Sequence, residues 1–338
     1  FLNTKPSPDI VIVAIDDKSL KEYGWWPWSD RSLHASAVNN LKAAGAAAIG
    51  YDVLFADEAG NASVFADALE QAGNVVLPGV GDNPQPTKQP LVVYKDFTLP
   101  APVFAEAAAD IAHANVVPEG GSVVRKIPLV VSDESGKTYP ALVLAMYKIY
   151  LEQHVQAGGI LTIHEDYSIH NGSIRIFNLE IPVDSKSQMR VNFVGGPNTF
   201  KRLSYADVIQ GNFKHDDVKD KLVLIGMTAS GWGTDYWSTP VSTEKMFGVE
   251  IHANALDTIL KGRFLQETSK LIAALTVLFM VVVMGFVLPL IRLRWGTVLA
   301  VVLFVGYGLG VFFAFDSGYI LNIFYPLISV PIMYVTRV

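Results

Sequence analysis

The chain has 338 residues, of which 51% are hydrophobic and 17% charged, with no cysteine and a net charge of −6. This length allows one large or two ordinary domains, which excludes a disulfide-stabilised miniprotein and a disordered regulator. The acidic balance argues against a nucleic-acid-binding surface, since phosphate neutralisation requires clustered positive charge. The absence of cysteine excludes thiolate catalysis, cysteine zinc sites and disulfides.

The mean hydropathy of +0.32 is high for a soluble protein and averages two unlike parts. Residues 1–269 contain 22 basic and 31 acidic residues, a net charge of −9, whereas residues 270–338 carry +3. We therefore predict an acidic soluble domain over 1–269 followed by a membrane region over 270–338.

The acidic part begins with alternating strands and helices. Its first apolar run is continuous and bounded by acids, which is typical of a strand buried on both faces. The predicted elements are a strand over 9–16, a short helix from Asp17, a break at 24–28, a helix over 31–44, a strand over 47–55, a helix over 64–72 and a strand over 74–80. This βαβ order predicts an α/β fold with a Rossmann-like parallel sheet.

The middle of the chain follows a different pattern, because prolines at 84, 86 and 90 indicate a loop. We predict an antiparallel subdomain or insertion over about 82–200, in which Asn171-Gly172 marks a hairpin. Its predicted elements are strands over 111–117 and 124–131, a helix over 141–153 and the hairpin over 168–183. The α/β pattern then returns with a helix over 205–210, a strand over 221–228 and a helix over 249–260.

Three apolar runs follow, and we predict that they form an all-α transmembrane bundle. The runs over 271–291 and 297–315 each match the roughly 20 residues that cross the hydrocarbon core of a bilayer. The third, over 319–336, contains Pro326 and Pro331, so we predict a kinked span there.

The charged flanks predict the orientation, because short cytoplasmic loops carry an excess of Lys and Arg. The turn with Arg292 and Arg294 is then inside, and the turn over 316–318 is outside. The acidic domain is therefore expected outside the membrane and the C-terminus in the cytoplasm. An exported domain requires a signal or a spanning helix before Phe1, and we expect a spanning helix.

Four aspartates lie in or just beyond predicted parallel strands: Asp16, Asp17, Asp52 and Asp235. Open α/β sheets bind ligands outside the carboxyl ends of their strands, and carboxylate oxygens suit a divalent cation. We predict a ligand or cation site there, with Asp16, Asp52 and Asp235 as the ligands of any metal. The alternative is that these aspartates cap helices and pin turns.

A tryptophan cluster, Trp25, Trp26 and Trp28, is either an aromatic wall for a ligand or a plug over the sheet edge. The glycine-rich segment 226–233 lacks both phosphate-loop spacings. No catalytic residue is predicted, because no Ser-His-Asp arrangement with a G-x-S-x-G elbow occurs. Three histidines lack metal-site spacing and are expected to be isolated core residues: His34, His113 and His252.

Several separated motifs resemble the second type of CHASE domain, the cyclase/histidine-kinase-associated sensory extracellular family. The resemblance covers most of residues 1–264 and is weaker in the middle. Its opening motifs are Asp9 to Asp17, Gly24-Trp-Trp-Pro-Trp28, Ala44-Gly-Ala46 and Tyr51-Asp-Val-Leu-Phe55, and its closing motifs are Ser204 to Val208, Lys221 to Ala229, Asp235, Thr239-Pro240 and Gly248 to Leu256.

The resemblance implies a multi-pass protein of the bacterial inner membrane with a periplasmic sensor for an unknown ligand. It also implies a homodimer whose cytoplasmic class III adenylate or guanylate cyclase follows the last span and uses ATP with Mg²⁺ or Mn²⁺. Membrane lipid is then a partner and nucleic acid is not. The helix over 249–260 leads into the first span and is expected to carry the signal.

Three alternatives remain open. The sensor could control a protein kinase or a cyclic-di-nucleotide enzyme instead of a cyclase. The chain could be a membrane-anchored hydrolase or solute-binding component that acts through Asp16, Asp52 and Asp235. It could also be a structural assembly domain, which a titration with metals or ligands would leave unchanged.

Overall fold

The computed structural model describes residues 5–120, 122–156, 167–170, 172–231 and 235–336. The chain divides into one unit of residues 3–262 and a second unit of residues 1–2 and 263–338. This division falls seven residues before the boundary that the charge pattern predicts, at the end of the last helix of the α/β part.

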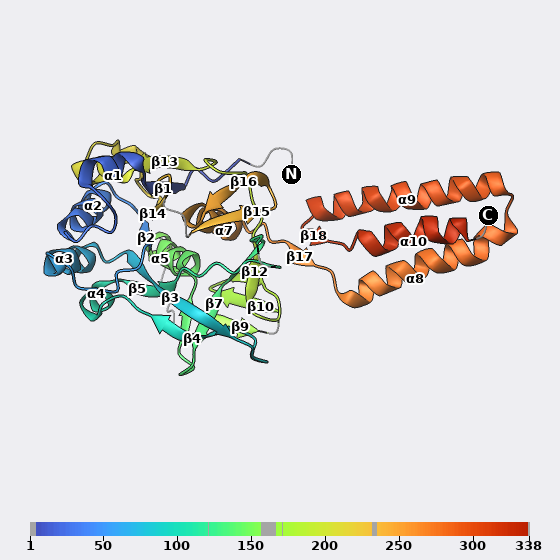
Figure 1. Ribbon diagram of the computed structural model, residues 1–338, viewed down its shortest axis with the longest axis horizontal. Coiled ribbons are helices and arrows are strands. Elements are labelled where there is room, and N and C mark those ends of the chain that lie inside the picture. Colours follow the sequence, from blue (N-terminus) through green and yellow to red (C-terminus); the bar gives the residue numbers. More distant parts are fainter. Residues whose placement is uncertain (1–4, 121, 157–166, 171, 232–234, 337–338) are drawn as a thin grey trace. The chain divides into compact units, whose positions relative to one another are not determined.

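A nine-stranded sheet organises the first unit (Figure 1). Its strands are β1 (Ile10–Ile15), β2 (Ala48–Asp52), β3 (Val75–Gln85), β4 (Val92–Thr98), β5 (Asp110–His113), β7 (Val130–Asp133), β8 (Thr138–Pro140), β13 (Lys201–Ser204) and β14 (Leu222–Met227). The order is β13-β1-β14-β2-β3-β4-β7-β8, and β5 also pairs with β3. The strands β13, β1, β14, β2, β3 and β5 are parallel, which confirms the expected α/β fold.

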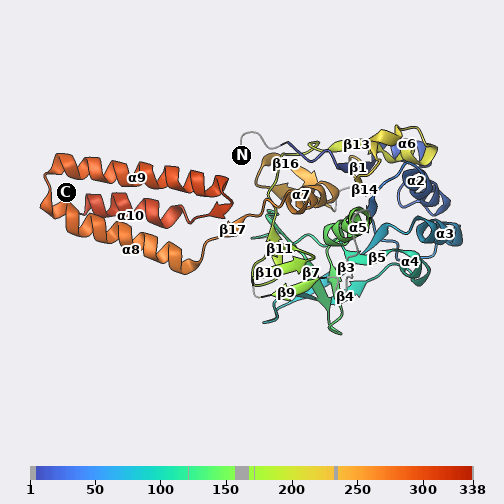
Figure 2. The same ribbon diagram turned by 180° about the vertical axis from the view of Figure 1, so that it is seen from behind.

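Helices cover both faces of this sheet (Figure 2). They are α1 (Asp17–Tyr23), α2 (Ser32–Ala43), α3 (Ala62–Ala72), α4 (Pro102–Ala107), α5 (Leu142–Gln156), α6 (Tyr205–Gln210) and α7 (Gly248–Lys261), with a 3-10 turn η1 (His215–Asp217). The first four and α6 pack on one face. On the other face, α5 lies against Gly50 of β2 and α7 against Gly226 of β14, since an added Cβ would overlap Met146 and Val249, respectively.

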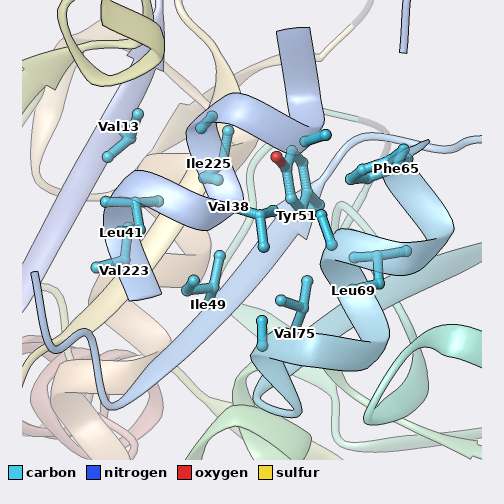
Figure 3. Close-up of a cluster of buried hydrophobic side chains, with 14 of the residues drawn as sticks. Val13, Val38, Leu41, Ile49, Tyr51, Phe65, Leu69, Val75, Val223 and Ile225 are labelled. Carbon is cyan, nitrogen blue, oxygen red and sulfur yellow. The ribbon is translucent and has the colours of Figure 1, made fainter. Parts of the chain in front are cut away.

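The main hydrophobic core lies between the sheet and α2, α3, α4 and α6 (Figure 3). Alternate residues of each strand point into it, as the two-residue period of a strand requires. Ile49 and Tyr51 of β2 and Ile225 of β14 are fully buried there, against Val38 of α2 and Phe65 of α3. Because β2 and β14 are covered on both faces, their sequences read as continuous apolar runs.

Smaller sheets complete the first unit. They are β6 (Lys126–Pro128) with β12 (Gln188–Arg190), β9 (Ser168–His170) with β10 (Ser173–Ile176) and β11 (Leu179–Pro182), and β15 (Tyr236–Thr239) with β16 (Ser242–Phe247). The expected hairpin turn at 171–172 separates β9 from β10, although Asn171 lies outside the described residues.

The middle of the chain differs from its expected pattern in two ways. First, β3 continues through Pro84 to Gln85 and forms a hairpin with β4, where a loop was expected. Beyond Gly79 the described partner of β3 is β4 on one side, a position that tolerates the missing N–H of proline. Second, β5 runs parallel to β3 in the main sheet, so the middle segment is not purely antiparallel.

The second unit contains α8 (Lys270–Val287), the 3-10 turn η2 (Leu288–Leu290), α9 (Leu293–Asp316), α10 (Phe324–Val335), and the short strands β17 (Gln266–Glu267) and β18 (Tyr319–Ile320). The helical stretches 270–290 and 293–316 are long and apolar enough to cross a membrane. α10 has 12 residues and extends about 18 Å, less than the roughly 30 Å of a bilayer core. The third span therefore stays a prediction.

Within this unit, α8, α9 and α10 lie alongside one another (Figure 1). Met280 and Met284 of α8 are buried against Val330 of α10. The residues just before α8 also pair with the turn after α9, because the Gln266 N–H donates to the Gly318 carbonyl at 2.8 Å. The entry to α8 and the exit from α9 are thus at the same end of the unit.

Candidate functional site

Asp16 follows β1 directly and caps α1. Its Oδ1 accepts hydrogen bonds from the Ser19 backbone N–H at 2.9 Å and from the Ser19 hydroxyl at 2.7 Å. The hydroxyl of Ser204, at the end of β13, donates to the same oxygen at 2.8 Å. Asp16 is therefore the N-cap of α1, which is the capping role that the sequence offered for these aspartates as the alternative to ligand binding.

Asp17 is exposed and connects α1 to the loop after β14. The backbone N–H of Ser230 donates to its Oδ1 at 2.9 Å, and the hydroxyl of Ser230 donates to its Oδ2 at 3.1 Å. Both oxygens of Asp17 therefore hold the loop that follows Ala229.

Asp52 ends β2 and points into the interior between the sheet and α7. Its side chain is only 8% exposed. The register pairs Asp52 with Gly226, which packs against Val249 of α7, and a Cβ on Gly226 would lie 3.2 Å from the Asp52 Cβ. The absence of a side chain at Gly226 thus makes room for both α7 and the carboxyl group of Asp52.

Asp235 directly precedes β15, and its side chain packs against Gly248, the first residue of α7. Its carboxylate fills the space above Gly248, where an added Cβ would overlap it. The indole Nε1–H of Trp237 donates to Asp235 Oδ1 at 2.6 Å, and the Gly248 N–H donates to the Asp235 carbonyl at 3.2 Å. Asp235 therefore fixes the first turn of α7 against the strand β15.

Asp52, Asp235 and His252 form a buried acid–histidine cluster. His252 is a residue of α7, and its Nε2 lies 3.7 Å from Asp52 Oδ1 and 3.2 Å from the carbonyl oxygen of Ala114. Asp52 Oδ2 and His252 Nδ1 are buried without a hydrogen-bond partner in the described part of the chain. Burial of these two polar atoms is therefore unfavourable, and no hydrogen bond among the described residues offsets their desolvation.

The cluster favours the neutral form of both groups. Burial, reinforced by the charge of Asp235, raises the pKa of Asp52 well above its usual range. Burial lowers the pKa of His252, although the charge of Asp235 opposes this shift. Nearby His113 of β5 is also fully buried, and burial with the charge of His252 lowers its pKa to about 3. Burial beside α7 therefore favours a protonated Asp52 and uncharged imidazoles at His252 and His113.

The tryptophans divide between core and surface. Trp28 is 4% exposed, stacks on Tyr205 at a ring distance of 5.8 Å and meets the edge of Trp26 at 5.0 Å. The Trp28 Nε1–H donates to the Gly24 carbonyl at 2.9 Å. Trp25 is 82% exposed. Trp26 and Trp28 therefore pack as a plug over the core, and the three rings share no common face.

The predicted cation ligands are not brought together as one set. Asp52 and Asp235 belong to the buried cluster, whereas Asp16 is committed to capping α1. Within the described residues, no three His, Asp or Glu side chains are grouped closely enough to hold a metal ion. A cation at Asp16, Asp52 and Asp235 stays a prediction.

A family model described as the CHASE2 domain matches residues 1–289. The chain belongs to the CHASE2 domain family. No curated protein and no solved structure matches the chain. The match confirms the resemblance that the separated motifs indicated, and it makes the chain a sensory protein.

The CHASE2 match includes all of the α/β unit and the whole of α8. The segment 263–269, which connects α7 to α8, therefore belongs to the matched region. Together with the two long apolar helices, this indicates a membrane protein in which the CHASE2 domain is an extracellular sensor.

In this CHASE2 domain, α7 is held by polar side chains that the sequence did not single out. Three of them lie four residues apart, on one face of the helix, and accept hydrogen bonds from the backbone of segment 192–198. The bonds run from Asn198 N to Glu250 Oε1 (2.7 Å), from Val194 N to Asn254 Oδ1 (3.0 Å) and from Asn192 N to Thr258 Oγ1 (3.0 Å). This α7 ladder sets the position of the helix along its own axis.

Sequence reasoning also missed the role of His252 in the CHASE2 domain. Its spacing to other histidines carried no signal, because its partner Asp52 lies 200 positions earlier and comes close only when α7 packs on the sheet. The available signal was the polar content of the α7 sequence. A surface helix shows polar residues on one face, whereas here Glu250, His252 and Asn254 are all buried.

Proposed function

We propose that the chain is the sensory and membrane-spanning part of a receptor. The CHASE2 domain perceives a signal outside the membrane and regulates an adenylate or guanylate cyclase that follows the last span in the cytoplasm. The observation that carries this proposal is the CHASE2 match over residues 1–289, which continues from the α/β unit into an apolar helix of spanning length.

The position of α7 supports a mechanical output. Residues 263–269 alone separate its C-cap, Gly262, from the first residue of α8. β17 in this segment pairs with β18 after α9. A displacement of α7 would therefore reach α8 directly and the α9–α10 turn through the β17–β18 pair.

The α7 ladder makes such a displacement stepwise. A small slide along the helix axis breaks all three hydrogen bonds together, because they lie on one face. The three hydrogen bonds are partly buried, and partly buried N–H groups that lose their acceptors are costly, so intermediate positions are disfavoured. A signal shifts the balance only by its different affinity for the two positions, and a hundredfold change requires roughly 3 kcal/mol.

The charge pattern supports the orientation. Arg292 and Arg294 flank the turn between α8 and α9, and short basic turns stay in the cytoplasm. The β17–β18 pair joins the other ends of these helices, on the side where the CHASE2 domain is attached. A homodimer suits this proposal, because class III cyclases of the kind that follow CHASE2 domains act as dimers.

The test is made on the full-length protein in a bacterial strain that lacks its own adenylate cyclase. Wild-type protein is expected to produce cyclic AMP, and a flexible Gly-Ser insertion between Arg263 and Phe264 is expected to change that level. The matched control carries the same insertion between Pro240 and Val241, in an exposed hairpin turn, and should behave as wild type.

Two results would contradict the proposal. One is a coding sequence after Val338 that contains no nucleotide cyclase. The other is an output of cyclic AMP that the insertion at Arg263 leaves unchanged. A protein kinase or cyclic-di-nucleotide enzyme in that coding sequence would agree with the proposed sensory role and would replace the cyclase as the regulated enzyme.

A further inference from the structure

A pocket of about 610 Å³ lies in the α/β unit, away from the acid–histidine cluster. It is bordered by the end of α4 and the residues after it, the start of β5, the strand β8 and the first turns of α5, and Tyr167 and Ile176 also line it. Pockets for small molecules have volumes of about 300 to 1,000 Å³, so a metabolite of modest size fits.

The lining combines small side chains with two aromatic walls. Ala105, Ala108 and Ala145 take up little volume, which is why the space is open. Tyr139 and Tyr167 face it from β8 and from the residue before β9. The floor and walls therefore suit the apolar part of a small organic molecule.

The aromatic wall at Tyr139 is held in place. Its ring stacks on Phe97 at a centroid distance of 4.2 Å, and its hydroxyl donates to Asp133 Oδ2 at 3.2 Å. Burial, together with the charge of Asp133, raises the pKa of Tyr139 to about 12, so this wall is an uncharged phenol at neutral pH. The Tyr167 hydroxyl donates to Thr138 Oγ1 at 3.1 Å.

The charges of the pocket favour an anion. Lys137 and Lys148 contribute two positive charges and Asp110 one negative charge. The Nζ of Lys137 lies 5.2 Å from the centroid of the Tyr139 ring, which places the ammonium beside the aromatic wall. The first turn of α5 adds the positive end of a helix dipole. No arginine borders the pocket among the described residues, and the forked recognition of phosphate by guanidinium is therefore absent there.

One wall of the pocket belongs to a helix that contacts α7. Leu144, Ala145 and Lys148 of α5 border the pocket, and α5 packs against α7 on the same face of the sheet. α5 is also seated tightly on β2, since a Cβ on Gly50 would overlap Met146. A molecule that moves α5 therefore changes the surface on which α7 rests.

We propose that this pocket is the ligand site of the sensor and that it binds a small organic carboxylate. Lys137 and Lys148 hold the carboxylate, and the alanines with Tyr139 and Tyr167 contact the rest of the molecule. Binding acts on α7 through α5, a step that rests on the proposed function of the CHASE2 domain as a receptor.

The test is thermal unfolding of the full chain in detergent micelles. Succinate and citrate at about 10 mM are the probes, with succinamide as the uncharged match and inorganic phosphate as the other anion. Stabilisation by mass action is expected to raise the Tm by about 2 °C or more with a carboxylate and not with succinamide. The double variant Lys137→Gln and Lys148→Gln should lose this shift.

Two further variants keep the test decisive if the double variant unfolds. Lys88→Gln with Lys95→Gln removes the same charge from exposed sites outside the pocket, so it should keep the shift. Ala109→Phe fills the pocket from an exposed position without changing charge, so it should abolish the shift.

Three outcomes would overturn the pocket assignment. They are no shift with either carboxylate, an equal shift in the Ala109→Phe variant, and stabilisation by phosphate alone. Thermal unfolding measures carboxylate binding without any cyclase. Carboxylate binding in a protein whose cyclic AMP output is not regulated would therefore contradict the proposed receptor function and support the pocket assignment. A cyclic AMP output that changes with the linker insertion, in a protein that binds no carboxylate, would contradict only the pocket assignment.

Discussion

Asp52 is the residue whose environment departs furthest from that of an ordinary aspartate. It is buried, its Oδ2 has no hydrogen-bond partner among the described residues, and Asp235 adds a second negative charge nearby. Because its pKa is raised in the folded state, the folded protein retains the proton of Asp52 at pH values where the unfolded chain has released it. Asp52 therefore stabilises the fold at low pH, and this contribution is lost as the pH rises through the raised pKa.

The variant Asp52→Asn tests whether Asp52 lowers the stability of the fold as the pH rises. The amide cannot ionise, so the variant is expected to have the higher Tm at pH 8, by about 2 °C or more if roughly 1 kcal/mol is regained. The difference from wild type should shrink toward pH 4. Thermal unfolding of the full chain between pH 4 and pH 8 measures it. Because His252 Nε2 lies 3.7 Å from Asp52 Oδ1, the comparison measures the Asp52–His252 pair rather than Asp52 alone.

The matched control is Asp67→Asn, at an exposed position of α3. It should follow the wild-type pH profile throughout. A Tm of Asp52→Asn that stays below wild type at pH 8 would show that the buried carboxyl is stabilised as an anion, against the proposed neutral state.

For single residues, the sequence predicts where a residue lies in the fold better than it predicts which residues that residue contacts. The rule that parallel strands end at one edge places Asp52 at the border of α7, where Asp235 also lies. The same rule cannot predict that Asp16 accepts from Ser19 and Ser204, because β13, which ends at Ser204, was not expected. The contact of His252 with Asp52 could not be predicted for a related reason: it joins residues 200 positions apart and depends on the packing of the whole of α7.

At the scale of elements, α7 depends on the α7 ladder. Asn254 is its central residue: its Oδ1 accepts from the Val194 N–H, and its Nδ2 donates to the Glu250 carbonyl at 2.9 Å. Asn254→Ala leaves the Val194 N–H without its acceptor in a partly buried place. We expect a loss of about 1 to 3 kcal/mol in the free energy of unfolding, measured by chemical denaturation.

Asn212→Ala is the comparison, because Asn212 is exposed and its Nδ2 donates to Oε1 of the neighbouring Gln210 at the end of α6. That change should stay within about 0.5 kcal/mol of wild type. If Asn254→Ala were equally neutral, the ladder would not fix α7, and the stepwise displacement in the proposed mechanism would lose its basis.

The elements that the sequence predicts best are those with strong periodicity or complete burial. β1, α2, β14 and α7 lie within one or two residues of their expected bounds. The strands β4, β12, β13, β15 and β16 were not expected, since short strands that are only partly buried lack a continuous apolar run. The prolines after Gly81 indicated a loop, but Pro84 lies in β3, which accommodates it because that part of the strand has one described neighbour, whereas Pro86 and Pro90 lie between β3 and β4.

At the scale of the whole molecule, the charge partition predicts the two units because burial in lipid and exposure to water select opposite compositions. It cannot predict the pairing of β17 with β18, which involves two residues from each segment. That pairing constrains topology. It places the segment before α8 and the turn after α9 at one end of the helical unit, with the α8–α9 turn at the other.

The absence of cysteine makes this topology directly measurable, because each introduced cysteine is the only one in the chain. Ser317→Cys places a thiol at the exposed turn after α9, and Leu290→Cys places one at the exposed turn after α8. In intact spheroplasts, a membrane-impermeant maleimide is expected to label position 317. Position 290 should be labelled only after permeabilisation. Wild-type protein serves as the unlabelled control.

The two positions decide different questions. Labelling of both from the same side would mean that α9 does not span the membrane, against its 24-residue length. Labelling of position 290 from outside and 317 from inside would keep the spans but reverse them, which puts the CHASE2 domain in the cytoplasm and rejects an external sensor. Only the expected pattern leaves α7 able to pass an outside signal to a cytoplasmic enzyme, since α8 then crosses from the sensor side to the basic turn at Arg292.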